Sequence, residues 1–233
     1  MFCFQTVMLH LLMLAGSLAV PVKSLPALEA QIPRASHAAL EAGLTALRHA
    51  VAAGTVSRAD VLTVIDYSRP STVPRLFVID VASNRVLFRE RVAHGRGSGE
   101  NATEKFSNLP SSHMTSLGVF RAGDAYSGGH GPSLRLEGLE PGFNDHARER
   151  AIVLHGAAYV SDSLIASQGR LGRSWGCPAV RPAIAKALIN AIRDGSLLVA
   201  YYPDVNWLRR SAFLGPDNPG ATEPRAADPS SGR

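Results

Sequence analysis

The sequence has little cysteine, and its histidines are scattered. Only Cys3 and Cys177 occur in 233 residues, and no Cys-x-x-Cys pair is present. The middle of the chain holds five histidines, none in a His-x-His or His-Glu-x-x-His spacing: His94, His113, His130, His146 and His155. These spacings are the usual signatures of zinc sites, so their absence disfavours a metal centre.

Lysine is also rare, and the formal net charge of +5 comes almost wholly from arginine. The three lysines are Lys23, Lys105 and Lys186. No Arg/Lys run and no interleaved aromatic stripe is present, so nucleic-acid binding is not indicated. A basic surface would suit an anionic partner such as a cell wall, although arginines spread over the surface are the simpler interpretation.

No apolar run is long enough for a membrane-spanning helix. The longest, Val7–Val20, is interrupted by His10 and is shorter than the roughly 18–20 residues that a span needs. Ser17 and Ala19 put small residues where signal peptidase requires them, although no Lys or Arg precedes the run. We therefore expect a signal peptide over residues 1–19. No cysteine follows it for a lipid anchor, so we expect an exported protein of the periplasm or cell envelope without a stable membrane anchor.

The remaining pattern predicts one helix followed by strands. Leu40, Leu44, Leu47 and Val51 recur at helical spacing within 36–51. β-branched and aromatic residues then predict strands over 61–67, 75–80, 85–92, 117–121, 133–137, 151–155 and 197–201. A helix opens at Pro182 and stops at Gly195. We divide the chain into a signal peptide, an N-terminal helical segment (20–58), a main domain (59–203) and a polar, partly disordered C-terminal tail (204–233).

Two glycine-rich segments look functional rather than structural. Residues 93–116 form a long predicted loop, and long loops in compact domains often carry function. Residues 126–131, Tyr-Ser-Gly-Gly-His-Gly, lack the Lys-Ser/Thr ending of a phosphate-binding loop. We expect both segments to border the site described next, because glycine lets backbone approach an extended peptide.

The stretch from Leu154 to Val180 contains the candidate chemistry. His155 ends an apolar strand, and Cys177 follows the glycine-rich run that begins at Gly172. A nucleophilic cysteine needs a base, and glycines let N–H groups reach a developing oxyanion. The run also matches the Gly-x-Ser-x-Gly elbow of serine hydrolases, but no histidine follows it and Pro178 interrupts the helix that the elbow requires.

A lone cysteine is often a small, inert, buried residue, and this alternative stays open on the residues alone. An exported protein exposes an unpaired thiol to oxidation, however, and Cys177 lies among Gly, Ser and Arg rather than apolar residues. These two facts favour a catalytic thiol. If His155 is its base, the pair should favour thiolate–imidazolium, and the thiol pKa should fall well below the roughly 8.5 of free cysteine.

The order of these motifs resembles the murein L,D-transpeptidase catalytic domain family. The resemblance runs from about residue 60 to about residue 202 and is carried by segments 64–68, 92–99, 106–108, 116–118, 133–139 and 172–180. Each segment alone is only weakly specific for the family, whereas the whole set in this order is strong evidence of the resemblance. The resemblance implies an α+β, β-rich fold, a mixed β-sandwich or barrel-like L,D-transpeptidase domain with a few flanking helices.

The resemblance also implies roles for single residues. Cys177 would be the nucleophile, His155 the base, and the carbonyl of Gly156 the third member of the triad. Ser174, Trp175 and Gly176 would shape the site, with the backbone N–H groups of Trp175, Gly176 and Cys177 as oxyanion donors. No cofactor and no metal are implied.

Two positions depart from the better-known family motif. Trp175 replaces a histidine beside the nucleophile, and Ala179 stands where the motif has an arginine. Arg173 or Arg181 would then contact the substrate carboxylate, and we assign Tyr126 and His130 to substrate binding as well. Together with the expected signal peptide, the resemblance predicts an exported cysteine-dependent L,D-transpeptidase acting on peptidoglycan tetrapeptide stems. The alternatives are an L,D-carboxypeptidase with water as acceptor and a catalytically silent wall-binding module.

Overall fold

The structure is a computed structural model that describes residues 25–215. The expected signal peptide, residues 1–19, and the last part of the expected tail, residues 216–233, lie outside the described residues. Within 25–215, no helix has the length and apolar character needed to cross a membrane.

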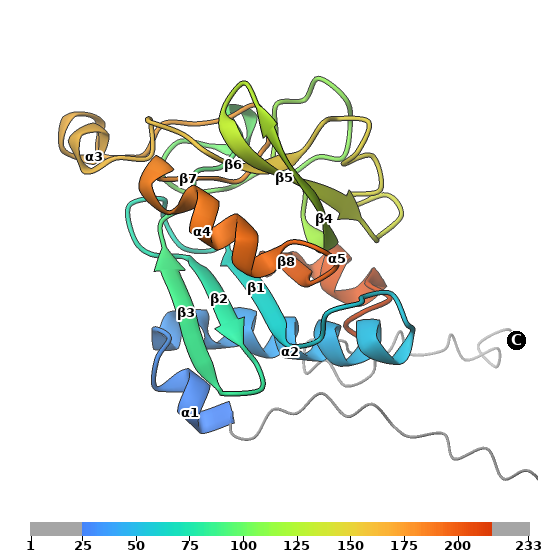
Figure 1. The fold of residues 1–233 in the computed structure, drawn as a ribbon. Helices are drawn as coiled ribbons and strands as arrows, with labels where there is room; N and C mark the ends of the chain where they lie inside the picture. Colours follow the sequence, from blue (N-terminus) through green and yellow to red (C-terminus); the bar gives the residue numbers. More distant parts are fainter. Residues whose placement is uncertain (1–24, 216–233) are drawn as a thin grey trace, which may run out of the picture.

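One eight-stranded mixed sheet organises the molecule, in the order β3-β2-β1-β8-β4-β5-β6-β7 (Figure 1). Its strands are β1 (Val61–Asp66), β2 (Leu76–Asp80), β3 (Arg85–Glu90), β4 (Gly118–Gly128), β5 (Gly131–Gly138), β6 (Val153–Gly156), β7 (Ala179–Val180) and β8 (Leu197–Tyr201). The helices are α1 (Leu25–Glu29), α2 (His37–Ala52), α3 (Asp162–Gln168), α4 (Pro182–Ile192) and α5 (Val205–Arg210), with short 3-10 turns at Arg34–Ser36 and Arg96–Ser98.

The two edges of the sheet approach each other. β1 pairs in parallel with β8 and β6 with β7, while the other pairs are antiparallel. Beyond β3, the N–H of Ala93 donates to the carbonyl of Ala179 in β7 at 2.8 Å. The sheet is thus nearly closed, and the expected β-rich, barrel-like fold with a few flanking helices is confirmed.

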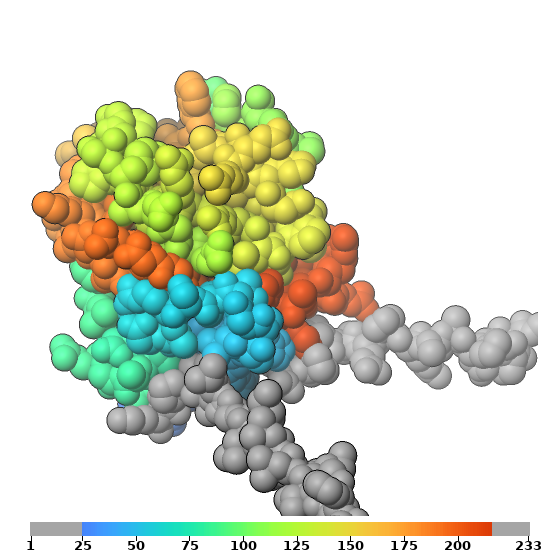
Figure 2. All heavy atoms as spheres, turned by 45° about the vertical axis from the view of Figure 1, so that its right-hand side comes forward, coloured from blue at the N-terminus to red at the C-terminus, as the bar shows by residue number. Residues whose placement is uncertain are grey.

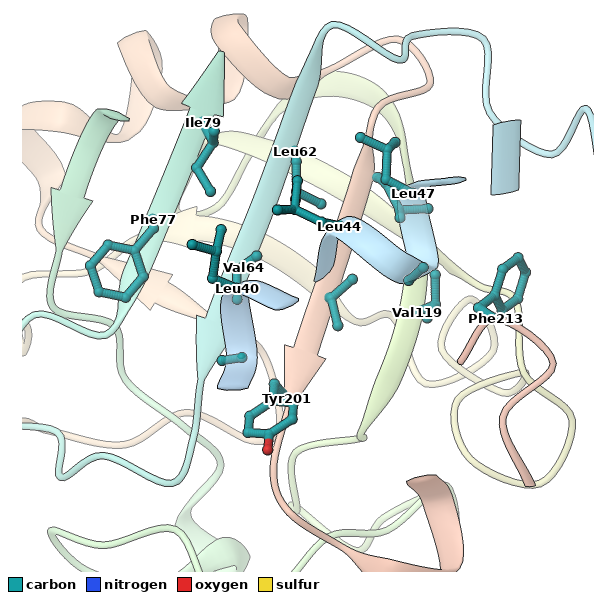
Figure 3. Packing of buried hydrophobic residues seen from close by; sticks show 14 of the residues in the cluster. Leu40, Leu44, Leu47, Leu62, Val64, Phe77, Ile79, Val119, Tyr201 and Phe213 are labelled. Atoms are coloured by element: carbon teal, nitrogen blue, oxygen red, sulfur yellow. The ribbon is translucent and has the colours of Figure 1, made fainter. Parts of the chain in front are cut away.

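Helices cover the sheet on two sides and bury every residue of β1. Leu40 and Leu44 of α2 lie beside Val64 and Leu62 of β1, and Leu47 belongs to the same cluster, as Figure 3 shows. The alternate β1 residues lie in a second apolar cluster with α4. Because side chains alternate along a strand, a central strand between two helix layers is buried on both faces, and β1 is apolar except at Thr63 and Asp66.

The C-terminal segment contributes to the core. Trp207 of α5 is fully buried, and its indole Nε1 donates to Glu140 at 2.9 Å. The sequence places residues from 204 onward in a polar tail, because Pro, Gly, Ser and charged residues dominate that stretch as a whole. In Figure 2, the lime-green to yellow residues of the β4–β5 hairpin and the segment leading to β6 form the upper part of the surface.

Candidate active site

The sheet register aligns four residues in one row. Tyr126 of β4 pairs with Ser133 of β5, Ser133 pairs with His155 of β6, and His155 pairs with Ala179 of β7. Cys177 precedes Ala179 by two residues, and residues two apart on an extended chain face the same side. The register therefore directs the thiol and the imidazole toward the same space.

That space is a cavity of about 490 Å³. It is lined by Tyr126, His130, Arg150, Ala151, Val153, His155, Tyr159, Arg173, Ser174, Trp175 and Cys177. Strands β4 and β6, the hairpin tip and the segment before β7 all contribute to it.

Cys177 is half-buried, and its thiol donates to the carbonyl of Ala151 at 3.7 Å. Burial raises the pKa of the Cys177 thiol, while the backbone of Val153 and the positive charge of Arg150 oppose this increase. Burial is the larger effect, so the expected low pKa of this thiol is wrong for the unliganded structure. The thiol is neutral at rest and must lose its proton during the reaction.

His155 is held by the backbone of its own neighbour. Its Nδ1 lies 3.0 Å from the carbonyl oxygen of Gly156, and because a carbonyl can only accept, Nδ1 carries the proton. Nε2 is left with a lone pair. Burial lowers the pKa of His155, the Gly156 hydrogen bond raises it, and the charge of His130 lowers it further. Among the described residues, no hydrogen bond joins His155 to Cys177, although both line the cavity.

The turn before the thiol positions backbone donors. Gly176 has φ +126°, and a Cβ there would lie 2.8 Å from the Met114 carbonyl, so only glycine fits. Its N–H is already bonded to Ser174 Oγ at 3.1 Å, and that hydroxyl donates to the Cys177 carbonyl at 2.6 Å. In the chain from 25 to 215, no hydrogen bond uses the N–H of Trp175 or Cys177. These two donors, rather than Gly176, are available to an oxyanion.

Trp175 stands at the rim of the cavity with 69% of its side chain exposed. Its ring stacks on His113 at 5.0 Å, and the Arg96 guanidinium lies 5.7 Å from the same ring centre. Arg96 also donates to His113 Nδ1 at 3.3 Å. The tryptophan is thus fixed from the loop side while most of its surface faces solvent.

Arg173 and Arg181, the two arginines predicted to contact the substrate carboxylate, both form hydrogen bonds within the protein. Arg173 lines the cavity, but its guanidinium donates to the Gly99 carbonyl at 3.0 Å and to Glu100 at 2.6 Å. Arg181 forms a two-point ion pair with Glu90, at 2.9 and 2.8 Å, and lines a separate cavity of about 360 Å³. Of the pair, only Arg173 shares the cavity with the thiol.

Arg150 is a site residue that sequence reasoning missed. Its guanidinium lines the cavity and acts electrostatically on Cys177. It is held by carbonyl and hydroxyl oxygens of the 93–116 loop: Ser107 O (2.7 Å), Ser116 Oγ (2.5 Å), Ser112 Oγ (3.2 Å) and Met114 O (2.6 Å). No carboxylate neutralises it in this set. Its position in a charged run, His146–Arg150, gave no signal in the sequence.

The 93–116 loop and the hairpin tip border the site, as expected. The Ser174 N–H donates to the His94 carbonyl at 3.0 Å, and the Arg96 N–H donates to the Ser174 carbonyl at 2.8 Å. Tyr126 and His130 line the cavity from the other side. The prediction that both segments lie near Cys177 is confirmed. Within 25–215, no group of three or more His, Cys, Asp or Glu side chains is arranged to hold a metal ion.

One protein-family model matches most of the chain. The family model described as "L,D-transpeptidase catalytic domain" matches residues 31–201. Similar solved structures include an L,D-transpeptidase from Mycobacterium smegmatis (18% identity, TM-score 0.37, covering 61% of this chain and 59% of that one). Another is the helical cell shape determining protein Pgp2 from Campylobacter jejuni (15%, 0.42, 74% and 58%). A third is an L,D-transpeptidase from Xylanimonas cellulosilytica (16%, 0.31, 59% and 58%).

The chain thus spans less than two thirds of each of these three structures. Among curated proteins, none matches the sequence.

Proposed function

The chain belongs to the L,D-transpeptidase catalytic domain family, and on that premise we propose that it is an exported cysteine-dependent L,D-transpeptidase. Its substrates are tetrapeptide stems of peptidoglycan, and its place of action is the periplasm or cell envelope. The observation that carries the proposal is the arrangement around one cavity of the Cys177 thiol, the His155 imidazole with its Gly156 hydrogen bond, and two free backbone N–H groups.

Acylation begins when the carbonyl carbon of the third stem residue approaches Sγ of Cys177. The thiol proton passes to Nε2 of His155, and the sulfur–carbon bond forms. The N–H groups of Trp175 and Cys177 donate to the resulting oxyanion. The Arg150 guanidinium stabilises the negative charge that develops on sulfur, which offsets part of the burial cost of the thiolate.

The tetrahedral adduct then collapses to a thioester. The imidazolium of His155 gives its proton to the nitrogen of the terminal D-alanine, and the carbon–nitrogen bond breaks. His155 returns to its neutral form and the acyl group stays on Cys177. An amine of a neighbouring stem next attacks the thioester, which forms a new peptide bond and regenerates the thiol.

The test is incubation of the purified protein with disaccharide-tetrapeptide, with products identified by mass. We expect a cross-linked dimer from the wild type and no dimer from Cys177→Ser. His155→Gln should slow the reaction by about 10²-fold or more, the usual effect of losing a general base. Tripeptide monomer alone would indicate a carboxypeptidase. No product at all, with retained binding to isolated wall, would indicate a silent wall-binding module.

A further inference from the structure

The tip of the β4–β5 hairpin places a second histidine, His130, against His155. β4 ends at Gly128 and β5 begins at Gly131, and these two residues pair, so Gly129 and His130 alone form the turn. The His130 ring stacks on the His155 ring with centres 4.5 Å apart and 27° between planes. His130 is exposed, whereas His155 is 3% exposed, and both line the cavity. The cavity therefore has one buried and one solvent-facing imidazole in contact.

Transfer of the acyl group from Cys177 to an amine requires the removal of two protons from the acceptor nitrogen, and His155 accounts for only one of them. An acceptor amine arrives in water mainly as an ammonium ion, and it loses two protons when it becomes an amide nitrogen. The first must leave before the nitrogen has a lone pair with which to attack. The second leaves after attack, and neutral His155 can take it and return it to the departing sulfur of Cys177. Water has a lone pair already and needs only this second transfer.

We propose that His130 is the base that removes the first proton from the acceptor ammonium, and so favours transfer to an amine over hydrolysis. The inference rests on the proposed function and deepens it at the acceptor side. The ammonium gives one proton to the His130 imidazole, and the neutral amine attacks the thioester carbonyl carbon. The carbon–sulfur bond then breaks, while the second proton passes through His155 to Sγ.

No other cavity residue can serve as this base. None of the described residues that line the cavity is a carboxylate. Arg150 and Arg173 are cations, and burial raises the pKa of Tyr159 to about 12, so its hydroxyl stays protonated. Tyr126 lies under the guanidinium of Arg135, 4.4 Å from its ring centre. The positive groups also oppose entry of an ammonium ion, which makes deprotonation at the exposed side of the cavity necessary.

The stacked geometry sets the order of the two transfers. A cationic His130 disfavours a second positive charge on the stacked His155 ring. Burial is the main cause of the lowered pKa of His155, and the charge of His130 lowers this pKa further. Because His130 is exposed, it can pass its proton to water before His155 accepts the next one. Only one of the two rings then needs to be charged at any time.

The experiment compares the wild type with His130→Gln and with Gly129→Ala. The control alters the same turn, where an added Cβ meets nothing within 4 Å. With disaccharide-tetrapeptide as donor and acceptor, the ratio of dimer to tripeptide is measured. This ratio is set after acylation and does not depend on the acylation rate. We expect it to fall about tenfold or more in His130→Gln, within the usual effect of a general base, and to stay at the wild-type value in Gly129→Ala.

A second arm replaces the stem amine by hydroxylamine, which is largely unprotonated at neutral pH. Aminolysis by hydroxylamine should proceed in His130→Gln at a fraction of total turnover close to that of the wild type. An unchanged dimer ratio, or equal loss with both acceptors, would overturn the role of His130 while leaving the proposed function intact. A wild type that forms no acyl-enzyme would overturn both, and one that forms tripeptide alone would overturn the role of His130.

Discussion

At the scale of single residues, the reactivity of Cys177 depends on two opposing effects. Burial raises the pKa of the thiol, and the backbone of Val153 together with the loop-held Arg150 cation lowers it. The thiolate fraction near neutral pH is therefore small, and substrate binding must promote proton transfer to His155. A buried, neutral nucleophile is also less exposed to oxidation than a standing thiolate.

Alkylation tests this balance directly. Iodoacetamide reacts with the thiolate, so its rate with wild-type protein should be slow near pH 6.5 and rise with a midpoint above the roughly 8.5 of free cysteine. Arg150→Met removes the stabilising charge and should move the midpoint higher, whereas Arg150→Lys keeps the charge and should move it less. A wild-type midpoint below pH 7 would contradict the assignment of a neutral thiol.

The pH dependence of kcat/KM reports on His155. The base must be neutral to accept the thiol proton, and burial holds the pKa of His155 below its ordinary value near 6.5. Activity should therefore persist as pH falls to 6.5 and decline only below it. Substitution of Gly156 is a poor probe of its hydrogen bond to His155, because in Gly156→Ala the new Cβ would lie 3.0 Å from the side chain of Ala185. The pH profile of kcat/KM probes this hydrogen bond without such a clash. An acid limb centred above pH 7 would argue against His155 as the base.

The sequence was enough to select Cys177 and His155 as candidates, because the features that single them out are local in sequence. Cys177 is a single thiol in a glycine-rich run, and His155 ends an apolar strand. Arg150 could not be selected in this way, because its role depends on how the segment before β6 folds back onto the loop. The pKa of the thiol was predicted in the wrong direction, since burial is set by packing rather than by neighbours along the chain.

At the scale of elements, the 93–116 loop and the turn before Cys177 act as one unit. A Cβ at Gly176 would lie 2.8 Å from the Met114 carbonyl oxygen, and Arg150 donates to the same oxygen at 2.6 Å. The loop also carries His113 and Arg96, which hold Trp175 in place. A change in the turn should therefore alter both the free energy of unfolding and the surroundings of the Cys177 thiol.

Gly176→Ala should expose this coupling. The new Cβ would stand 2.8 Å from backbone at φ +126°, which strains the turn and should lower the free energy of unfolding by about 1–3 kcal/mol. The free N–H groups of Trp175 and Cys177 would move with it, so kcat should fall as well. Gly129→Ala, which meets nothing within 4 Å, is the matched control in urea denaturation. Equal stability of the two variants would contradict the argument.

Elements with a strong period were predicted well, and those without one were missed. α2, α4 and β8 begin and end within two or three residues of their predicted bounds, because apolar residues recur along them. α3 has no buried residue and hence no apolar stripe, and β7 is only two residues long. The turn predicted over 126–131 is shorter in the structure, since β4 and β5 continue almost to the tip.

At the scale of the whole molecule, Glu140 connects α5 to the sheet. This buried carboxylate accepts hydrogen bonds from Trp207 Nε1 at 2.9 Å, from the Val119 N–H at 2.7 Å and from the Ser211 hydroxyl. Burial raises the pKa of Glu140, and the three donors oppose that increase. The folded protein thus holds the Glu140 proton more tightly than the unfolded chain, so ionisation reduces stability as pH rises from about 4.3 through the folded pKa.

Trp207→Phe should make this dependence steeper. Loss of one donor raises the pKa of Glu140 further, so the variant should lose about 1.5–3 kcal/mol of unfolding free energy at pH 7 and less at pH 4. Urea denaturation at both pH values measures the difference. In a Glu140→Gln background, the loss caused by Trp207→Phe should be the same at both pH values. A pH-independent loss with Glu140 present would show that only packing was affected.

The central claim is that Cys177 becomes acylated by a peptidoglycan stem, and a trapped intermediate tests it most directly. Purified protein is mixed with disaccharide-tetrapeptide, quenched in acid within the first turnover, and digested for mass analysis. We predict that the peptide containing Cys177 gains the mass of the donor minus D-alanine, and that Cys177→Ser shows no such thioester. Products formed without this adduct, or an acyl group found on another residue, would contradict the account.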